Sequence, residues 1–163
     1  MPEVIKIDPH NPDHTLIARA VKILGEGGII AYPTETFYGL GADIRIPEAL
    51  ERIFLIKGRP FSNPIALIAS DAQYLTEWVQ KIHPAAYDLI EAFWPGALTI
   101  VFHASARIPP RLTGGTGAIG IRVSSHPVAS ALARTLRSPI TATSANISGA
   151  GECSTAAEVT RHL

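Results

Sequence analysis

The chain of 163 residues has no net charge at pH 7, and 47% of its residues are hydrophobic against 17% charged. This composition excludes a disordered protein and gives no support to nucleic-acid binding through overall positive charge. The single Cys153 excludes an intramolecular disulfide, and no apolar run reaches the length of a membrane span, so we expect one cytoplasmic domain over residues 1–163.

Helical and extended patterns alternate along the first half of the chain. Apolar residues at helical spacing predict a helix over 16–24 that ends at a glycine cluster, and 28–32 predicts a short buried strand. A second helix is expected from Pro47 to Ile56, with Pro at its first position and Gly58 beyond its end. The continuous apolar run 65–69 predicts another strand.

The second half continues this alternation. We expect helices over 72–81, 85–93 and 127–136, strands over 98–102, 118–123 and 139–143, and a last helix that begins near Ser154. Interleaved strands and helices predict an α/β protein with a twisted, open sheet that is mixed or partly parallel and is flanked by helices.

Two cations lie two residues apart where the second helix ends, in the sequence Lys57-Gly58-Arg59-Pro60. An ammonium and a planar guanidinium held on one turn could bind the same anion. Basic residues at a helix C-terminus also stabilise the helix dipole, and the local sequence leaves both interpretations open.

Polar loops follow two of the expected strands. Residues 32–41 combine hydroxyl groups, a carboxylate and two glycines, and residues 141–149 combine hydroxyl groups with one amide. Loops beyond strand ends are common ligand sites in open α/β sheets, although such loops can also be turns capped by their own side chains.

Arg122 lies inside an apolar strand, where an unpaired charge is costly. It is therefore at an edge, paired with a carboxylate, or directed into a ligand cavity. The six histidines have no metal-ligand spacing, so we read them as surface or capping residues, and we read Cys153 as an inert thiol.

Six segments, in this order, resemble the YrdC/Sua5 family, the threonylcarbamoyl-AMP synthases. They are residues 32–43, 57–60, 63–68, 94–102, 121–127 and 143–149, and the resemblance spans residues 12 to 160. It implies a YrdC-like fold with a large concave cavity on one face of the sheet. The chain departs from the family pattern at Ile68, where longer members have His, and we expect the family's C-terminal segment to be missing from residues 1–163.

The resemblance also implies a nucleotidyltransferase reaction. L-Threonine, bicarbonate or CO₂, and ATP would give threonylcarbamoyl-adenylate and pyrophosphate, for modification of adenosine at tRNA position 37 by a separate transferase complex. Mg²⁺ is expected with the nucleotide rather than in a dedicated protein site.

The same resemblance implies roles for individual residues. The catalytic pair that holds the phosphates and the carbamate would be Lys57 and Arg59. Further nucleotide contacts would come from Asn63, Ser144 and Asn146. The threonine site would include Thr34, Arg122, which takes the carboxylate, and Ala142. On this basis Lys57→Ala or Arg59→Ala should abolish turnover with little change in the thermal unfolding of the ligand-free protein.

Two alternatives stay open. One is a carbamoyl-adenylate-forming domain like that of hydrogenase maturation proteins, which shares the fold but normally sits beside other domains. The other is a module that binds tRNA or double-stranded RNA, against which the neutral composition argues. Direct binding of tRNA by the enzyme is left open as well.

Overall fold

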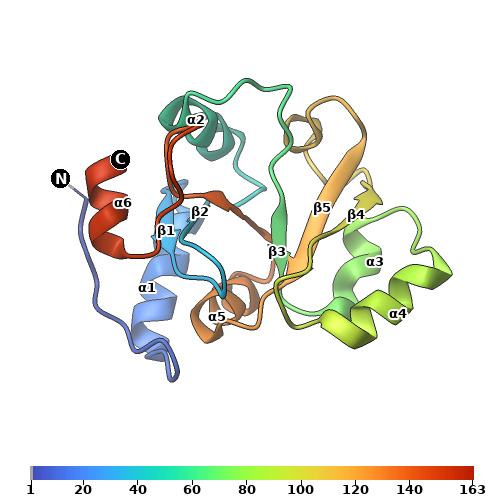
Figure 1. Ribbon diagram of the computed structural model, residues 1–163, viewed down its shortest axis with the longest axis horizontal. Coiled ribbons are helices and arrows are strands. Elements are labelled where there is room, and N and C mark those ends of the chain that lie inside the picture. Colours follow the sequence, from blue (N-terminus) through green and yellow to red (C-terminus); the bar gives the residue numbers. More distant parts are fainter. Residues whose placement is uncertain (1) are drawn as a thin grey trace.

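Two small sheets and the helices around them form the protein (Figure 1). The structure is a computed structural model that describes residues 2–163. The helices are α1 (His14–Gly25), α2 (Pro47–Lys57), α3 (Leu75–Trp78), α4 (Pro84–Phe93), α5 (Pro127–Leu136) and α6 (Ala156–His162), with 3₁₀ turns η1 (Ala72–Tyr74) and η2 (Pro110–Thr113). The strands are β1 (Ile30–Tyr32), β2 (Gly39–Gly41), β3 (Leu67–Ala69), β4 (Ile100–His103), β5 (Ala118–Val123), β6 (Ile140–Thr141) and β7 (Thr143–Ser144).

The strands divide into a three-stranded and a four-stranded sheet. The first has the order β1-β2-β7 and is antiparallel throughout, and the second has the order β4-β5-β3-β6 with one parallel pair, β3 and β5. The expectation of an α/β protein with mixed pairing and flanking helices is confirmed. The expectation of a single sheet is wrong.

The strand expected over 139–143 is the point where the two sheets separate. Its first part, β6, pairs with β3, and its second part, β7, pairs with β2. Between them the amide of Ala142 donates to the carbonyl of Ala66, at 2.8 Å. One short segment therefore belongs to both sheets and brings the loop 142–146 to their junction.

Two further expectations need correction. The helix predicted over 72–81 is only η1 and α3, because Val79 forms a β-bridge with Ala104 and the amide of Gln80 donates to the carbonyl of His103. The strand β2 was not predicted: it is a Gly-Leu-Gly segment that lies in the middle of its sheet.

Helix ends follow the sequence signals. Gly58 ends α2 in the left-handed conformation, at φ 56°, where residues other than glycine are strained. His83 and His126 cap α4 and α5, and Thr155 forms the expected capping box with Glu158 before α6. Within residues 2–163 we find no helix whose length and apolar character would suffice to span a membrane.

The core has two clusters, one on each face of β3. Leu67 and Ala69 belong to the larger cluster, which includes residues of α2 and β5 and the buried Cys153. Ile68 points the other way, because side chains alternate along a strand, and belongs to the cluster formed with α1 and α5. In Figure 1 these two helices lie together below the sheets.

Candidate functional site

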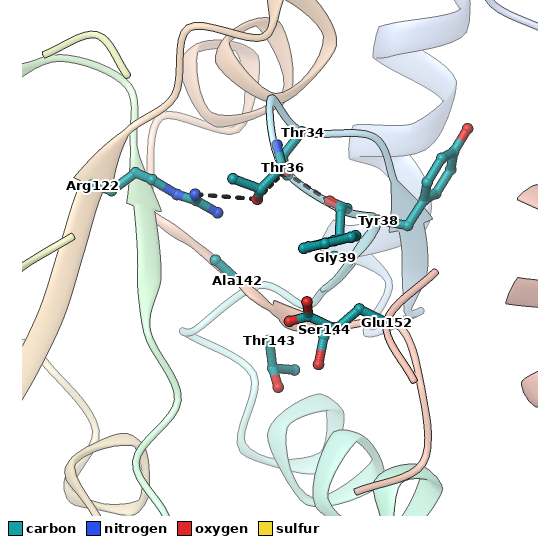
Figure 2. A pocket seen from close by; sticks show the side chains of 10 residues that line it. Thr34, Thr36, Tyr38, Gly39, Arg122, Ala142, Thr143, Ser144 and Glu152 are labelled. Carbon is teal, nitrogen blue, oxygen red and sulfur yellow. Dashed lines mark hydrogen bonds between the residues drawn. The ribbon is translucent and has the colours of Figure 1, made fainter. Parts of the chain in front are cut away.

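A small polar cavity opens at the junction of the two sheets, with a volume of about 110 Å³ (Figure 2). Its wall comes from the loop between β1 and β2, from β5, from the segment of β6 and β7, and from Glu152. Thr34, Arg122 and Ala142, the three residues implied for threonine binding, all line this cavity, and so does Ser144. A larger cavity of about 490 Å³, mostly apolar, lies elsewhere, between the N-terminal segment, α1 and α6.

Arg122 reaches the cavity because it occupies the face of β5 opposite to Ile121 and Val123. Those two side chains are buried in the larger core cluster, whereas the Arg122 side chain is 13% exposed. Its Nη1 lies 3.3 Å from Oε1 of Glu35, and it donates a long hydrogen bond of 3.4 Å to Oγ1 of Thr36. Of the alternatives for Arg122, pairing with a carboxylate and exposure to a cavity are therefore both correct.

The hydroxyl of Thr34 is used inside its own loop. It donates to the carbonyl of Phe37 at 2.7 Å, accepts from the amide of Thr36 at 3.1 Å, and lies 3.0 Å from the Thr36 hydroxyl. These contacts use the one donor and both lone pairs of a hydroxyl group. The loop is thus capped by its own side chains, and Thr34 contributes to the cavity mainly by fixing the shape of its wall.

Lys57 lies at the end of α2 but is only 1% exposed. Its Nζ donates to the carbonyls of Ser144 and Asn146 and to Oδ1 of Asn146, the last two at 2.7 and 3.2 Å. All three ammonium donors are then used by neutral oxygens, and burial, with a smaller contribution from Arg59, lowers the pKa of Lys57 to about 8. Lys57, Ser144 and Asn146, predicted as nucleotide contacts, are therefore brought together.

Arg59 is half-buried and turns toward Asn63. Its Nε donates to the carbonyl of Asn63 at 3.3 Å and its Nη2 to the carbonyl of Pro64 at 2.8 Å. Lys57, Arg59, Asn63 and Asn146 do not line the 110 Å³ cavity. The predicted residues therefore form two groups, one around the cavity and one at the end of α2, and Ser144 belongs to both.

Three contributors to the site were not singled out in the sequence. Glu35, whose side chain is 15% exposed, pairs with Arg122, and its Oε2 accepts a hydrogen bond from the Ser124 hydroxyl. Glu152 lines the cavity from the segment before α6. Glu35 lies in the polar loop and in the family-like segment 32–43, and Ser124 lies in the family-like segment 121–127, but neither residue was given a role of its own, and no local pattern marks Glu152.

Within residues 2–163, His, Cys, Asp and Glu side chains do not gather in groups of three or more that could hold a metal ion. Glu152 is the acidic residue in the cavity lining, and Glu35 is engaged with Arg122, which also lines the cavity. This set does not fit a dedicated Mg²⁺ site, which would need several converging oxygen ligands.

Comparison with known proteins gives consistent matches. The Sua5/YciO/YrdC family model, described as telomere recombination, matches residues 22–163. A curated relative from Thiobacillus denitrificans, named threonylcarbamoyl-AMP synthase, is 43% identical over 85% of this chain and 73% of its own length.

Solved structures agree with this match. P. abyssi Sua5 in complex with L-threonine is 36% identical with a TM-score of 0.90, covering 93% of this chain and 45% of the Sua5 chain. E. coli YciO is 33% identical with a TM-score of 0.91, covering 100% and 80%. The chain therefore spans less than half of the Sua5 chain and most of the YciO chain.

Proposed function

Because the chain belongs to the Sua5/YciO/YrdC family, we propose that it is an L-threonylcarbamoyladenylate synthase, a cytoplasmic nucleotidyltransferase that uses L-threonine, bicarbonate and ATP. The observation that supports this most directly is the cavity at the sheet junction, which has the Arg122 guanidinium in its wall and shares Ser144 with the Lys57 group. The name of the 43% identical relative favours this reaction over the formation of a carbamoyl adenylate.

The 110 Å³ cavity suits an amino acid better than a nucleotide. Pockets for drug-sized ligands measure roughly 300–1,000 Å³, so ATP would have to extend beyond this cavity. Within residues 2–163, Nε and Nη2 of Arg122 donate no hydrogen bond to a protein acceptor, which leaves part of the guanidinium for a carboxylate. We assign the threonine carboxylate to Arg122, with Thr34 and Ala142 in the wall beside it.

We assign the phosphates of ATP to the group at the end of α2, made up of Lys57, Arg59, Asn63, Ser144 and Asn146. The side chains of Lys57 and Arg59 now donate to neutral oxygens, and a charged phosphate oxygen is a stronger acceptor than a carbonyl. Binding would therefore exchange these internal partners for phosphate. Mg²⁺ would arrive as the ATP complex, held mainly by the phosphates and water.

The proposed chemistry needs no covalent nucleophile from the protein. The threonine amine adds to CO₂ derived from bicarbonate and loses a proton, which gives a carbamate. A carbamate oxygen then attacks the α-phosphorus of ATP, the bond to the β-phosphate oxygen breaks, and pyrophosphate leaves. The protein's task is positioning and stabilisation of charge, which suits the cations Lys57, Arg59 and Arg122. A separate transferase complex would consume the product to modify tRNA.

Pyrophosphate release tests the proposal. Purified protein is incubated with ATP and Mg²⁺, and threonine and bicarbonate are each supplied or omitted. We expect release to require both, and to be lost in Arg122→Ala but kept in Arg107→Ala, which removes an exposed arginine from a surface pair with Glu77. Release that depends on carbamoyl phosphate would favour the carbamoyl-adenylate reaction, and salt-sensitive tRNA binding without turnover would favour an RNA-binding module.

A further inference from the structure

A carboxylate that does not line the cavity is paired with the guanidinium that does. We propose that Glu35 is a positioning residue that holds Arg122 in the orientation needed to bind the substrate carboxylate, and so sets the affinity for threonine. This inference rests on the proposed function, because it assigns the carboxylate of that substrate to Arg122.

Glu35 is itself held in place by the protein. Its Oε2 accepts from the Ser124 hydroxyl, and that hydroxyl accepts in turn from the amide of His126, at 3.1 Å, where α5 begins. The other oxygen, Oε1, is fully buried and has no hydrogen-bond partner within the described residues, although Nη1 of Arg122 lies 3.3 Å away. Arg122 is the only cation paired with this buried oxygen in the described part of the chain, so the ion pair compensates its charge.

The ion pair between Glu35 and Arg122 engages only one nitrogen of the guanidinium. The ion pair of Arg122 with Glu35 and its hydrogen bond to Thr36 are both made by Nη1. Figure 2 shows the side chain extending from β5 toward Thr36, and the 3.4 Å hydrogen bond between them is long and therefore weak. The buried charge of Glu35 is the stronger of the two constraints on Nη1. Held at Nη1, the planar guanidinium keeps its other donors in a fixed direction for a second carboxylate.

The test is Glu35→Gln, which keeps the size of the side chain and a group that can accept from Ser124 but removes the charge. We expect KM for threonine to rise about tenfold with kcat within about twofold, the lower end of what losing a supporting partner behind a ligand-binding side chain costs at metal sites. In an Arg122→Lys background the same change should have no further effect, because Glu35 acts through the guanidinium. Glu77→Gln, which breaks the exposed pair with Arg107, should leave KM unchanged.

Removing a negative charge beside Arg122 could instead strengthen its attraction for the threonine carboxylate. An unchanged or lower KM in Glu35→Gln would therefore overturn the proposal, as would an equal loss in the Arg122→Lys background. If Glu35→Gln fails to fold, Ser124→Ala frees the other carboxylate oxygen and should raise KM in the same direction.

A second measurement separates this inference from the proposed function. Nitrogen NMR of the arginine side chains, assigned with Arg122→Lys, should show separate Nη1 and Nη2 signals for Arg122 in the ligand-free protein and one averaged signal in Glu35→Gln. An averaged signal in the unchanged protein would contradict positioning by Glu35. Separate signals in a protein that neither binds threonine nor releases pyrophosphate would keep the positioning role and reject the enzyme.

Discussion

Lys57 has two roles at the scale of a single residue. Its ammonium joins the end of α2 to the loop 144–146, and its position at the end of that helix makes it the candidate partner of a phosphate. Within residues 2–163 no carboxylate lies within salt-bridge distance of Lys57, so burial without an anion, with a smaller contribution from the Arg59 charge, holds the pKa of Lys57 well below the ordinary value of a lysine.

This pKa predicts the pH dependence of nucleotide binding. With a pKa of about 8, Lys57 is protonated in the free protein below pH 8 and neutral above it, whereas a bound polyphosphate raises the pKa. ATP affinity should therefore be greatest below pH 8 and fall as the pH rises through 8, by up to about tenfold between pH 7 and 9. Calorimetric Kd values across this range test it. Lys57→Met should abolish the dependence, and a flat profile in the unchanged protein would contradict it.

Because Lys57 is buried, we expect Lys57→Ala to destabilise the protein more than the sequence alone suggested. The sequence predicts little effect on unfolding, but the substitution leaves the oxygens of Ser144 and Asn146 without their donor. We expect the free energy of unfolding to fall by about 1–3 kcal/mol, as for other buried groups that lose a partner. Arg59→Ala, at a half-buried side chain, should cost less than about 1 kcal/mol. Urea unfolding compares the two, and equal losses would contradict the distinction.

At the scale of the elements, the junction of the two sheets depends on Thr141. This residue is in β6, but its fully buried hydroxyl donates to the carbonyl of Leu40 at 2.8 Å and accepts from the amide of Ala42 at 2.9 Å, at the end of β2. The hydroxyl of Tyr32 in β1 donates to the Thr141 carbonyl, at 2.8 Å. One residue of the four-stranded sheet thus hydrogen-bonds to two strands of the other.

We therefore expect Thr141→Val to loosen the junction. Valine has the same shape but satisfies neither the Leu40 carbonyl nor the Ala42 amide, so unfolding should become easier by about 1–3 kcal/mol. Hydrogen exchange should also be faster at the amide of Ala42. Thr76→Val, at an exposed position in α3, is the matched control and should change stability by less than about 0.5 kcal/mol. Unchanged exchange at Ala42 would show that the hydroxyl is dispensable.

Local patterns predicted most elements but not the junction. Apolar runs located β3 and β5, and the helices over 47–56 and 127–136 appear almost as expected. The Gly-Leu-Gly strand β2 has poor intrinsic strand propensity and is extended because β1 and β7 pair with it on both sides. The division at Ala142 and the Glu35–Arg122 pair likewise depend on partners distant in sequence, which no local pattern records.

At the scale of the whole molecule, the two core clusters share one strand. Leu67 and Ala69 of β3 contribute to the larger cluster and Ile68 to the smaller. A strand buried on both faces cannot lose one cluster without exposing residues that support the other. The protein should therefore unfold as one cooperative unit.

The two tryptophans of the protein allow a test of whether both core clusters unfold together. Trp78 and Trp94 both pack against the larger cluster, whereas Leu132 of α5 is buried in the smaller one. We predict that Leu132→Ala lowers stability by about 2–5 kcal/mol and shifts the tryptophan fluorescence transition as far as the circular dichroism transition. Leu55→Ala, at a side chain that is 73% exposed, should shift neither. A fluorescence transition that stays in place would show that the clusters unfold separately.

The reactivity of the buried Cys153 can measure how often the protein opens locally near the cavity. It is the chain's only cysteine, its side chain is fully buried, and its carbonyl accepts from the amide of Tyr38 at 2.8 Å, beside the cavity wall. A thiol reagent can reach this buried side chain only after a local opening, and we expect that opening to be the separation of the segment before α6 from Tyr38, which one hydrogen bond holds together. The rate of labelling therefore reports how often that wall opens, without any engineered cysteine, and a ligand that bridges the two segments would slow it.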